Sequence, residues 1–220
     1  NQIPTQAKKL AAETAGLDAD NVHLHVTVVG GSFGRRTDLD YILQIAAIAK
    51  GMPERPIKLT WSREEDMRQD FYRPSALAQM QGVMGDDGRP QAIQMDIISQ
   101  STSRSWGKRV GIPTPGPDRI LAEGAGDAPY SAPHHQVSAF ASSLDVPSGF
   151  WRAVGASYNG FFNECFLDEL AHAGQRDPMD MRLAMTEDQF PQAHAVLKKL
   201  RTTSRWDQAM SKNKARGLAM

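Results

Sequence analysis

The segment GGSFGRR at residues 30–36 carries the strongest chemical signal in this sequence. Its three glycines within five positions leave a backbone bare enough for a ligand to touch, with amide N–H groups free to point at that ligand. Two arginines follow at once, and guanidinium groups prefer phosphate or carboxylate partners. The pattern is neither the GxGxxG of dinucleotide-binding folds nor the GxxxxGK of P-loops. The residues themselves therefore indicate an anion-binding loop, or else a tight turn with solvated arginines.

Three carboxylates lie close together further along, at Glu164, Asp168 and Glu169, and His172 follows them. Paired carboxylates at helical spacing can perform acid–base chemistry or bind a metal ion. More often such groups are the buried partners of arginines or form a solvated helix face. We favour this second interpretation and assign them no catalytic role.

The single cysteine, Cys165, excludes an internal disulfide framework and any cysteine-rich zinc or iron–sulfur site. Phenylalanines surround it in the sequence, so we predict that it is a small core residue. His134 and His135 have no further ligand at the spacing typical of a metal site. The sequence therefore predicts no metal ion bound directly by protein side chains.

The composition indicates a globular chain without a strongly charged partner. Its 220 residues can bury a sizeable core as one large domain or two small ones. The 25 basic and 25 acidic side chains give no net charge that would favour nucleic acid. No apolar run approaches the roughly 20 residues that cross a membrane, and no signal-like segment opens the chain. Because it begins at Asn1 and stops at ARGLAM, which resembles the first half of a strand, we expect a piece of a longer polypeptide.

Regular elements are predicted on both sides of the glycine segment. The run IPTQAKKLAAETAGL predicts a helix that ends near Gly16, and the alternating residues 22–29 (VHLHVTVV) predict a strand. After the glycines, apolar residues share one face of a helix that Gly51 and Pro53 end. These apolar residues are Leu39, Ile42, Leu43, Ala46 and Ala49. A strand that opens into a glycine turn and then a helix is a common way to hold an anionic cofactor.

The middle of the chain predicts further strands. Residues 56–61 (PIKLTW) favour a short strand, and Ser62 with Glu65 forms a capping-box pattern for a brief helical turn. Residues 76–84 and 91–99 predict two strands joined by the hairpin signal GDDG.

The second half of the chain predicts a long loop followed mainly by helices. Residues 101–133 are rich in Gly, Pro and Ser and predict the loop, and residues 136–143 predict another strand. Helices are predicted at residues 158–173, after the Asp-Pro pair at 177–178, and at 192–200. Helices and hairpins segregate rather than alternate, so we predict an α+β fold with mixed or antiparallel sheets and packed helices.

Four segments, in the order in which they occur, resemble the large subunit of the molybdenum hydroxylases, a family of xanthine dehydrogenases, aldehyde oxidoreductases and isoquinoline 1-oxidoreductases. NQIP at residues 1–4 resembles the TQxP element, GGSFGRR resembles the cofactor loop, and WSREEDMRQDFYRP at 61–74 resembles the segment after the next strand. FWRAVGASYNGFFNECFLDELAHAGQRDP at 150–178 resembles the RxxG turn and its helix. The RR ending, FYRP and WRAVG are most similar to the isoquinoline 1-oxidoreductase branch. The resemblance spans nearly the whole chain and implies that residues 1–220 form part of a molybdopterin-binding domain.

The resemblance also implies which residues contact the cofactor. The family's loop passes close to the molybdenum and the pyranopterin, with backbone N–H groups facing the ligand and an aromatic ring beside the metal. Carried over to this sequence, that loop consists of Gly30, Gly31, Ser32, Phe33, Gly34 and Arg35. Arg35 and Arg36 stand where relatives have Gly-Lys. The sequence leaves open whether these arginines reach phosphate or pair with Asp38 and Asp40.

Two positions outside the loop are implied as well. Gln2 matches a family glutamine that hydrogen-bonds an oxygen ligand of the metal, a task for which an amide is suited because it donates without adding charge. Arg152 and Ala153 lie on a turn whose amides approach the terminal phosphate of the cofactor. In this family the metal is held by the pterin dithiolene rather than by side chains.

The resemblance implies that the whole enzyme hydroxylates an N-heteroaromatic or aldehyde substrate with oxygen from water. The cofactor would be molybdopterin in its cytosine dinucleotide form. Electrons would pass to 2Fe–2S clusters in an iron–sulfur small subunit, and a cytochrome is a further possible acceptor. The remainder of its own large subunit would be another partner. The family implies a bacterial protein that is periplasmic or membrane-associated, with a cytoplasmic location also open.

The family's catalytic base is a glutamate in a GxGE-type segment, which this sequence does not contain. We therefore name no catalytic residue and expect the 220-residue chain to be inactive by itself. Two other functions stay open: a non-catalytic assembly module that docks an iron–sulfur subunit, and a generic phosphate- or nucleotide-binding domain. Exposed apolar residues in 101–133 would favour the first. A bound mononucleotide that is insensitive to substitution of Arg152 would favour the second.

Overall fold

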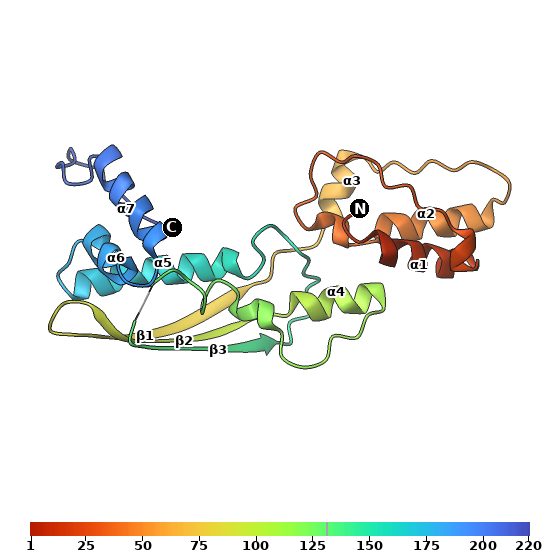
Figure 1. The fold of residues 1–220 in the computed structure, drawn as a ribbon. Coiled ribbons are helices and arrows are strands. Elements are labelled where there is room, and N and C mark those ends of the chain that lie inside the picture. Colours follow the sequence, from red (N-terminus) through yellow and green to blue (C-terminus); the bar gives the residue numbers. More distant parts are fainter. Residues whose placement is uncertain (131) are drawn as a thin grey trace. The chain divides into compact units, whose positions relative to one another are not determined.

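The computed structural model describes residues 1–130 and 132–220 and confirms the α+β class (Figure 1). The elements are α1 (Pro4–Ala15), η1 (Ala19–Asn21), η2 (Arg35–Thr37), α2 (Asp40–Gly51), α3 (Arg63–Arg68), β1 (Ala76–Met84), β2 (Pro90–Gln100), α4 (Thr102–Val110), η3 (Arg119–Ala122), β3 (His134–Ser142), α5 (Ala156–Ala173), α6 (Pro178–Thr186) and α7 (Pro191–Thr203). No helix in the described ranges is long and apolar enough to cross a membrane.

The chain divides into two compact units. Unit 1 consists of Asn1–Ser75, Gln100–Asp118 and Ser143–Val154. Unit 2 consists of Ala76–Ser99, Arg119–Ser142 and Gly155–Met220.

Unit 1 is built around the helices α1 and α2, which pack side by side (Figure 1). Helix α1 ends as predicted at Gly16, whose left-handed φ of 75° lets its N–H reach back to the carbonyls of the last turn. Ala7 of α1 and Leu39 at the start of α2 are buried with Val110 of α4 in one apolar core. This core holds together the two helices between which the glycine segment lies in the sequence.

Helix α4 lies within residues 101–133, where we predicted only a long loop, and this prediction is wrong. The Ser101 hydroxyl accepts a hydrogen bond from the Arg104 N–H and caps the helix, and Gly111 ends it with a φ of 68°. Trp106 and Val110 pack into the core of unit 1. The serines that suggested a loop are therefore in part a helix cap. Ser131, in the same predicted loop, lies outside the described residues.

Two predicted strands of unit 1, at residues 22–29 and 56–61, are absent from the secondary structure, so both predictions are wrong. Alternating apolar residues favour a strand, but a strand exists only when a neighbour accepts and donates its backbone hydrogen bonds. No residue in the described ranges pairs with either segment as a strand. Val26, Val28 and Val29 are correspondingly exposed.

Unit 2 contains a three-stranded sheet with the order β1-β2-β3. β1 and β2 form the predicted antiparallel hairpin, with Gln79 opposite Asp96 in the register. The GDDG turn closes it through hydrogen bonds from Gly85 N–H to the Arg89 carbonyl and from Gly88 N–H to the Gly85 carbonyl. Helix α5 lies along one face of the sheet (Figure 1). Leu167 and Leu170 of α5 are buried in the core of this unit.

The last two helices of unit 2 begin as the sequence predicted. The Asp177 carboxylate caps α6 by accepting from the N–H groups of Met179 and Asp180, with Pro178 at the first helical position. The final residues ARGLAM form no strand, in contrast to our prediction. Instead the Leu218 side chain is buried in an apolar cluster, and the backbone of this segment pairs with no strand.

Cys165 is exposed rather than buried in the core, so this prediction is also wrong. Helix α5 turns Leu167 and Leu170 toward the core, and Cys165 lies on the same exposed side as Phe161. Its phenylalanine neighbours in the sequence therefore say little about its surroundings, because residues one position apart on a helix point in different directions.

Candidate functional site

The glycine segment of unit 1 forms a tight turn between residues 29 and 37. Gly34 has a φ of 101° and Phe33 before it has a φ of 50°, so two consecutive residues are left-handed. Gly34 therefore uses a conformation that residues with a side chain avoid. The Arg35 N–H then donates to the Ser32 carbonyl over 2.9 Å, which starts the short helix η2.

Gly34 is fixed for a second reason, the approach of another segment. A Cβ atom at Gly34 would lie 2.2 Å from the carbonyl oxygen of Phe150, well inside van der Waals contact. The loop and the segment around Phe150 therefore pack backbone against backbone.

Replacing Gly34 by alanine is expected to destabilise the chain by about 2–4 kcal/mol, because a left-handed residue and a backbone clash act together. Urea unfolding measures this loss. Gly51→Ala is the matched control: a Cβ there meets nothing within 4 Å, so helix propensity favours the substitution. A Gly34→Ala variant as stable as the control would contradict the close packing of the loop.

The loop leaves a row of backbone donors available. Among the described residues, none accepts a hydrogen bond from the N–H of Gly30, Gly31, Ser32 or Phe33. Gly30 and Gly31 carry no side chain to cover these groups, and both are exposed. Consecutive free amides beside a left-handed pair are a typical binding place for anionic or strongly accepting ligand atoms.

Gln2 is held against this loop. The side-chain Oε1 of Gln2 accepts a hydrogen bond from the Gly34 N–H over 3.1 Å, and the backbone N–H of Gln2 donates to the Arg36 carbonyl over 3.1 Å. Because the oxygen is engaged, the Nε2 group is the end of the amide that remains for another partner. The side chain is exposed, so this donor is accessible.

The Arg35 guanidinium is engaged by carboxylates. Nη1 and Nη2 bind both oxygens of Asp40 at 3.2 and 3.0 Å, Nε lies 2.9 Å from Asp70, and Asp66 is 3.8 Å from Nη2. The sequence left open a pairing with Asp38 or Asp40, and Asp40 is the partner. The sequence did not indicate Asp66 and Asp70 as partners of Arg35, because they lie in and just after α3, far from the loop in the sequence. Arg35 thus anchors the loop with its side chain, and contact between Arg35 and a ligand stays a prediction.

Helix α4, which the sequence analysis missed, supports the loop from a different direction. Trp106 Nε1 donates to the Thr37 carbonyl over 3.0 Å, and Arg109 Nε donates to the buried Asp38 carboxylate over 2.8 Å. Burial raises the pKa of the Asp38 carboxyl, although the Arg109 hydrogen bond acts in the opposite direction. Ser101 and Gly111, the two caps of α4, were the signals that could have revealed the helix, whereas its contacts with Thr37 and Asp38 join segments far apart in the sequence.

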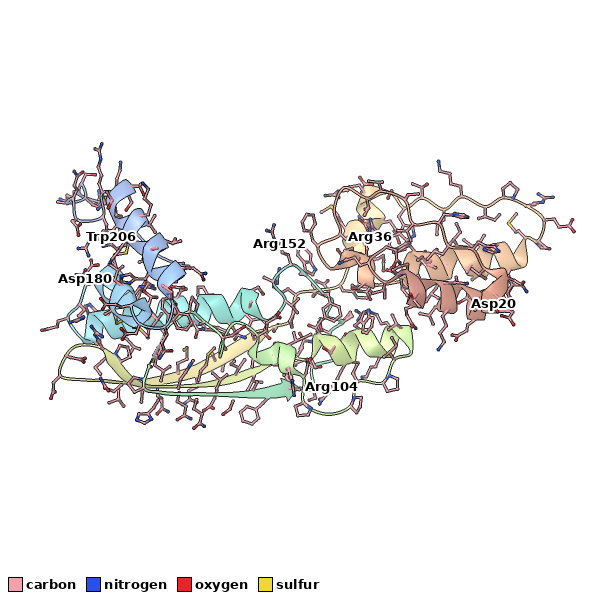
Figure 2. The ribbon with its side chains drawn as sticks, in the orientation of Figure 1. Asp20, Arg36, Arg104, Arg152, Asp180 and Trp206 are labelled. Atoms are coloured by element: carbon pink, nitrogen blue, oxygen red, sulfur yellow. The ribbon has the colours of Figure 1, made fainter. Side chains whose placement is uncertain are left out.

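Arg152 projects from the turn at residues 151–154 (Figure 2). Its guanidinium carbon lies 5.9 Å from the centre of the Phe33 ring, a cation–π contact. No carboxylate in the described part of the chain forms an ion pair with it, in contrast to Arg35. Ala153 follows with a φ of 67°. The structure therefore brings Arg152, Phe33, Gly34 and Gln2 together, although the sequence separates them by up to 150 positions.

Two of the three carboxylates of α5, Glu164 and Asp168, pair with an arginine, and the third, Glu169, is exposed. Arg182 is fully buried and donates to Glu164 through Nε at 3.0 Å and Nη2 at 2.8 Å, and to Asp168 through Nη1 at 2.7 Å. Tyr130 donates to the second Glu164 oxygen over 2.7 Å. Burial, and then this hydrogen bond, raise the pKa of the Tyr130 phenol, which stays protonated as a donor. The interpretation as buried arginine partners is supported, and the described residues contain no cluster suited to a metal ion.

Comparison with known proteins identifies the family. The model of the molybdopterin cofactor-binding domain matches residues 1–185. The beta subunit of isoquinoline 1-oxidoreductase from Brevundimonas diminuta is 26% identical over 212 residues, which cover 93% of this chain and 26% of that protein. The membrane-bound aldehyde dehydrogenase (pyrroloquinoline-quinone) of Gluconacetobacter polyoxogenes is 28% identical over 198 residues, covering 85% of this chain and 24% of that protein.

The fold has relatives among solved structures. Quinoline 2-oxidoreductase from Pseudomonas putida 86 superposes with a TM-score of 0.68 at 18% identity, covering 93% of this chain and 27% of that chain. The chain thus spans about a quarter of the length of the relatives it matches. The resemblance inferred from the four motifs is confirmed, and the chain belongs to the molybdopterin cofactor-binding domain family.

Proposed function

We propose that this chain forms one wall of the molybdopterin site in the large subunit of a molybdenum hydroxylase. The observation that carries the proposal is the row of four free amides at Gly30, Gly31, Ser32 and Phe33, on a loop whose left-handed geometry is held from several sides. The residues fit such a cofactor: bare backbone for close approach, N–H donors for its oxygen and phosphate atoms, and an arginine without a carboxylate partner among the described residues.

Each residue of the proposed site has its own task. The amides of Gly30 to Phe33 donate to acceptor atoms of the cofactor, and the Gln2 Nε2 group donates without adding charge. Arg152 supplies a positive charge for a phosphate, and Ala153 presents its backbone on the same turn. Arg35 keeps the loop in place through Asp40 and Asp70. When bound, the molybdenum centre supplies the redox chemistry that no side chain provides.

The substrate we propose is an N-heteroaromatic or an aldehyde, hydroxylated with oxygen from water. The names of the two relatives, an isoquinoline oxidoreductase and an aldehyde dehydrogenase, support these two classes. The proposed partners are an iron–sulfur small subunit with 2Fe–2S clusters and the remainder of the large subunit. The proposal also includes the cytosine dinucleotide form of the cofactor and a cytochrome as electron acceptor. Periplasmic or membrane association belongs to it as well.

The assembly-module alternative depended on exposed apolar side chains in residues 101–133. Val110 and Leu121 are buried, and no large apolar side chain in the described part of this range is strongly exposed. This observation gives the alternative no support. The alternative of a generic phosphate- or nucleotide-binding domain uses the same loop. It differs only in the expected ligand, which would be a mononucleotide instead of molybdopterin.

The test is chemical analysis of the parent protein, expressed at full length. Molybdenum measured by mass spectrometry and pterin measured by fluorescence after oxidation are expected in equal amounts, with cytosine nucleotide released on hydrolysis. The purified 220-residue chain is expected to turn over no aldehyde or N-heterocycle, since a positioned base contributes roughly 10²–10⁴-fold and the sequence contains no GxGE-type segment. Pyrroloquinoline quinone or a mononucleotide in place of pterin would contradict the proposal. Turnover by the 220-residue chain would contradict the expectation that the catalytic base lies elsewhere in the parent protein.

A further inference from the structure

The turn that carries Arg152 has a costly backbone. Ala153 has a φ of 67° and Val154 has a φ of 37°, so two consecutive residues with side chains are left-handed. For a β-branched residue such as valine this conformation is a true outlier. Outliers of this kind persist only where neighbouring groups hold them, and they concentrate at ligand sites.

Arg73 is one group that holds this turn. Its Nη1 and Nη2 atoms both donate to the carbonyl oxygen of Arg152, each over 3.3 Å. The same guanidinium lies 5.5 Å from the centre of the Trp151 ring. Trp151 is itself fixed, because its Nε1 donates to the Phe71 carbonyl over 3.1 Å. The segment before β1 therefore holds the turn at both Trp151 and Arg152.

The carbonyl carbon and the side chain of Arg152 are bonded to the same Cα atom. Holding the carbonyl restrains the backbone at residue 152 and thereby the direction of its Cα–Cβ bond, from which the side chain extends to its contact with Phe33. In the structure this direction places the guanidinium above Phe33, in the loop with the free amides. A change at Arg73 would therefore reach the loop without any contact between Arg73 and a ligand.

We propose that Arg73 is a positioning residue of the cofactor site, which acts by holding the Arg152 carbonyl and so keeping the Arg152 guanidinium over Phe33. The inference rests on the proposed molybdopterin function and adds to it a residue that lies outside both the glycine loop and the Arg152 turn. Arginine is needed because its two terminal N–H groups converge on one oxygen, which the single ammonium of lysine reproduces only in part.

The experiment is a double-mutant cycle in the full-length protein, with retained molybdenum and pterin per protein as the readout. Arg73→Met is expected to lower retention about fivefold, and Arg73→Lys is expected to recover part of it. In the Arg152→Ala background, Arg73→Met is expected to cause almost no further loss, because the side chain that it positions is gone. Arg68→Met, at an exposed arginine in α3, is the matched control and should retain wild-type molybdenum.

Melting temperatures accompany each measurement, and Arg73→Gln, which keeps one donor, replaces Arg73→Met if the latter does not fold. Losses that multiply in the double variant would overturn the inference, since Arg73 would then act independently of Arg152. Wild-type retention in a folded Arg73→Met protein would overturn it as well. A wild-type protein without molybdenum would instead refute the proposed function, and this inference with it.

Discussion

Replacing Gly31 by valine is expected to abolish the retention of molybdenum by the full-length protein while leaving its thermal stability near that of the wild type. A Cβ at this position would lie 2.5 Å from Cε2 and 3.0 Å from Cζ of the Phe33 ring. Phe33 is 65% exposed, so its ring can rotate away, and Gly31 does not have a positive φ, so the fold loses little. The branched side chain would then occupy the space from which a ligand approaches the free amides.

The measurement compares molybdenum per protein and melting temperature in the same preparations. Gly217→Val is the control, because a Cβ there meets nothing within 4 Å and the residue is remote in sequence from the loop. Arg152→Ala should reduce retention less than Gly31→Val, as it removes one charge-assisted contact worth about 1.5–3 kcal/mol. A Gly31→Val enzyme with a full complement of molybdenum would mean that the glycine segment is only a turn.

Replacing Arg182 by methionine is expected to lower the free energy of unfolding by about 3–5 kcal/mol. The substitution leaves the buried Glu164 carboxylate without its guanidinium partner and removes the contact to Asp168. A buried charge without compensation is among the most costly defects in a folded protein. Because methionine fills much of the same volume, the loss reflects charge rather than a cavity.

Urea unfolding of the 220-residue chain measures this effect. Arg119→Met in the same unit is the control: Arg119 is exposed, and its replacement should change stability by less than about 0.5 kcal/mol. Adding Glu164→Gln to Arg182→Met should recover part of the loss, since the unpaired charge disappears. Equal stability of Arg182→Met and the control would show that Glu164 is accommodated without the arginine.

The features predicted correctly from the sequence depend on local chemistry. The Gly16 helix end, the Ser62 cap of α3 and the Asp177 cap of α6 each require only residues a few positions away. The hairpin of β1 and β2 is equally local, because its glycine turn sets the pairing. For the site, the closely spaced glycines of the loop could be recognised for the same reason.

The features that were missed depend on partners distant in the chain. Residues 22–29 have the composition of a strand, but strand formation is decided by a neighbour that the segment itself does not encode. The pairing of Arg109 with Asp38 joins positions 71 residues apart, and the contact of Arg73 with Arg152 spans 79. At α4 the composition is ambiguous, because Ser101, one of the serines that suggest a loop, caps a helix instead.

The unpaired segment at residues 22–29 has a practical consequence for handling the chain. None of residues 23–29 donates a backbone hydrogen bond to a described residue, and Val28 is fully exposed. The run contains no proline, glycine, lysine or glutamate, the residues with which proteins commonly protect a free β-edge from self-association. We therefore expect copies of this chain purified alone to associate through this exposed apolar run, and Val28→Lys to reduce that association.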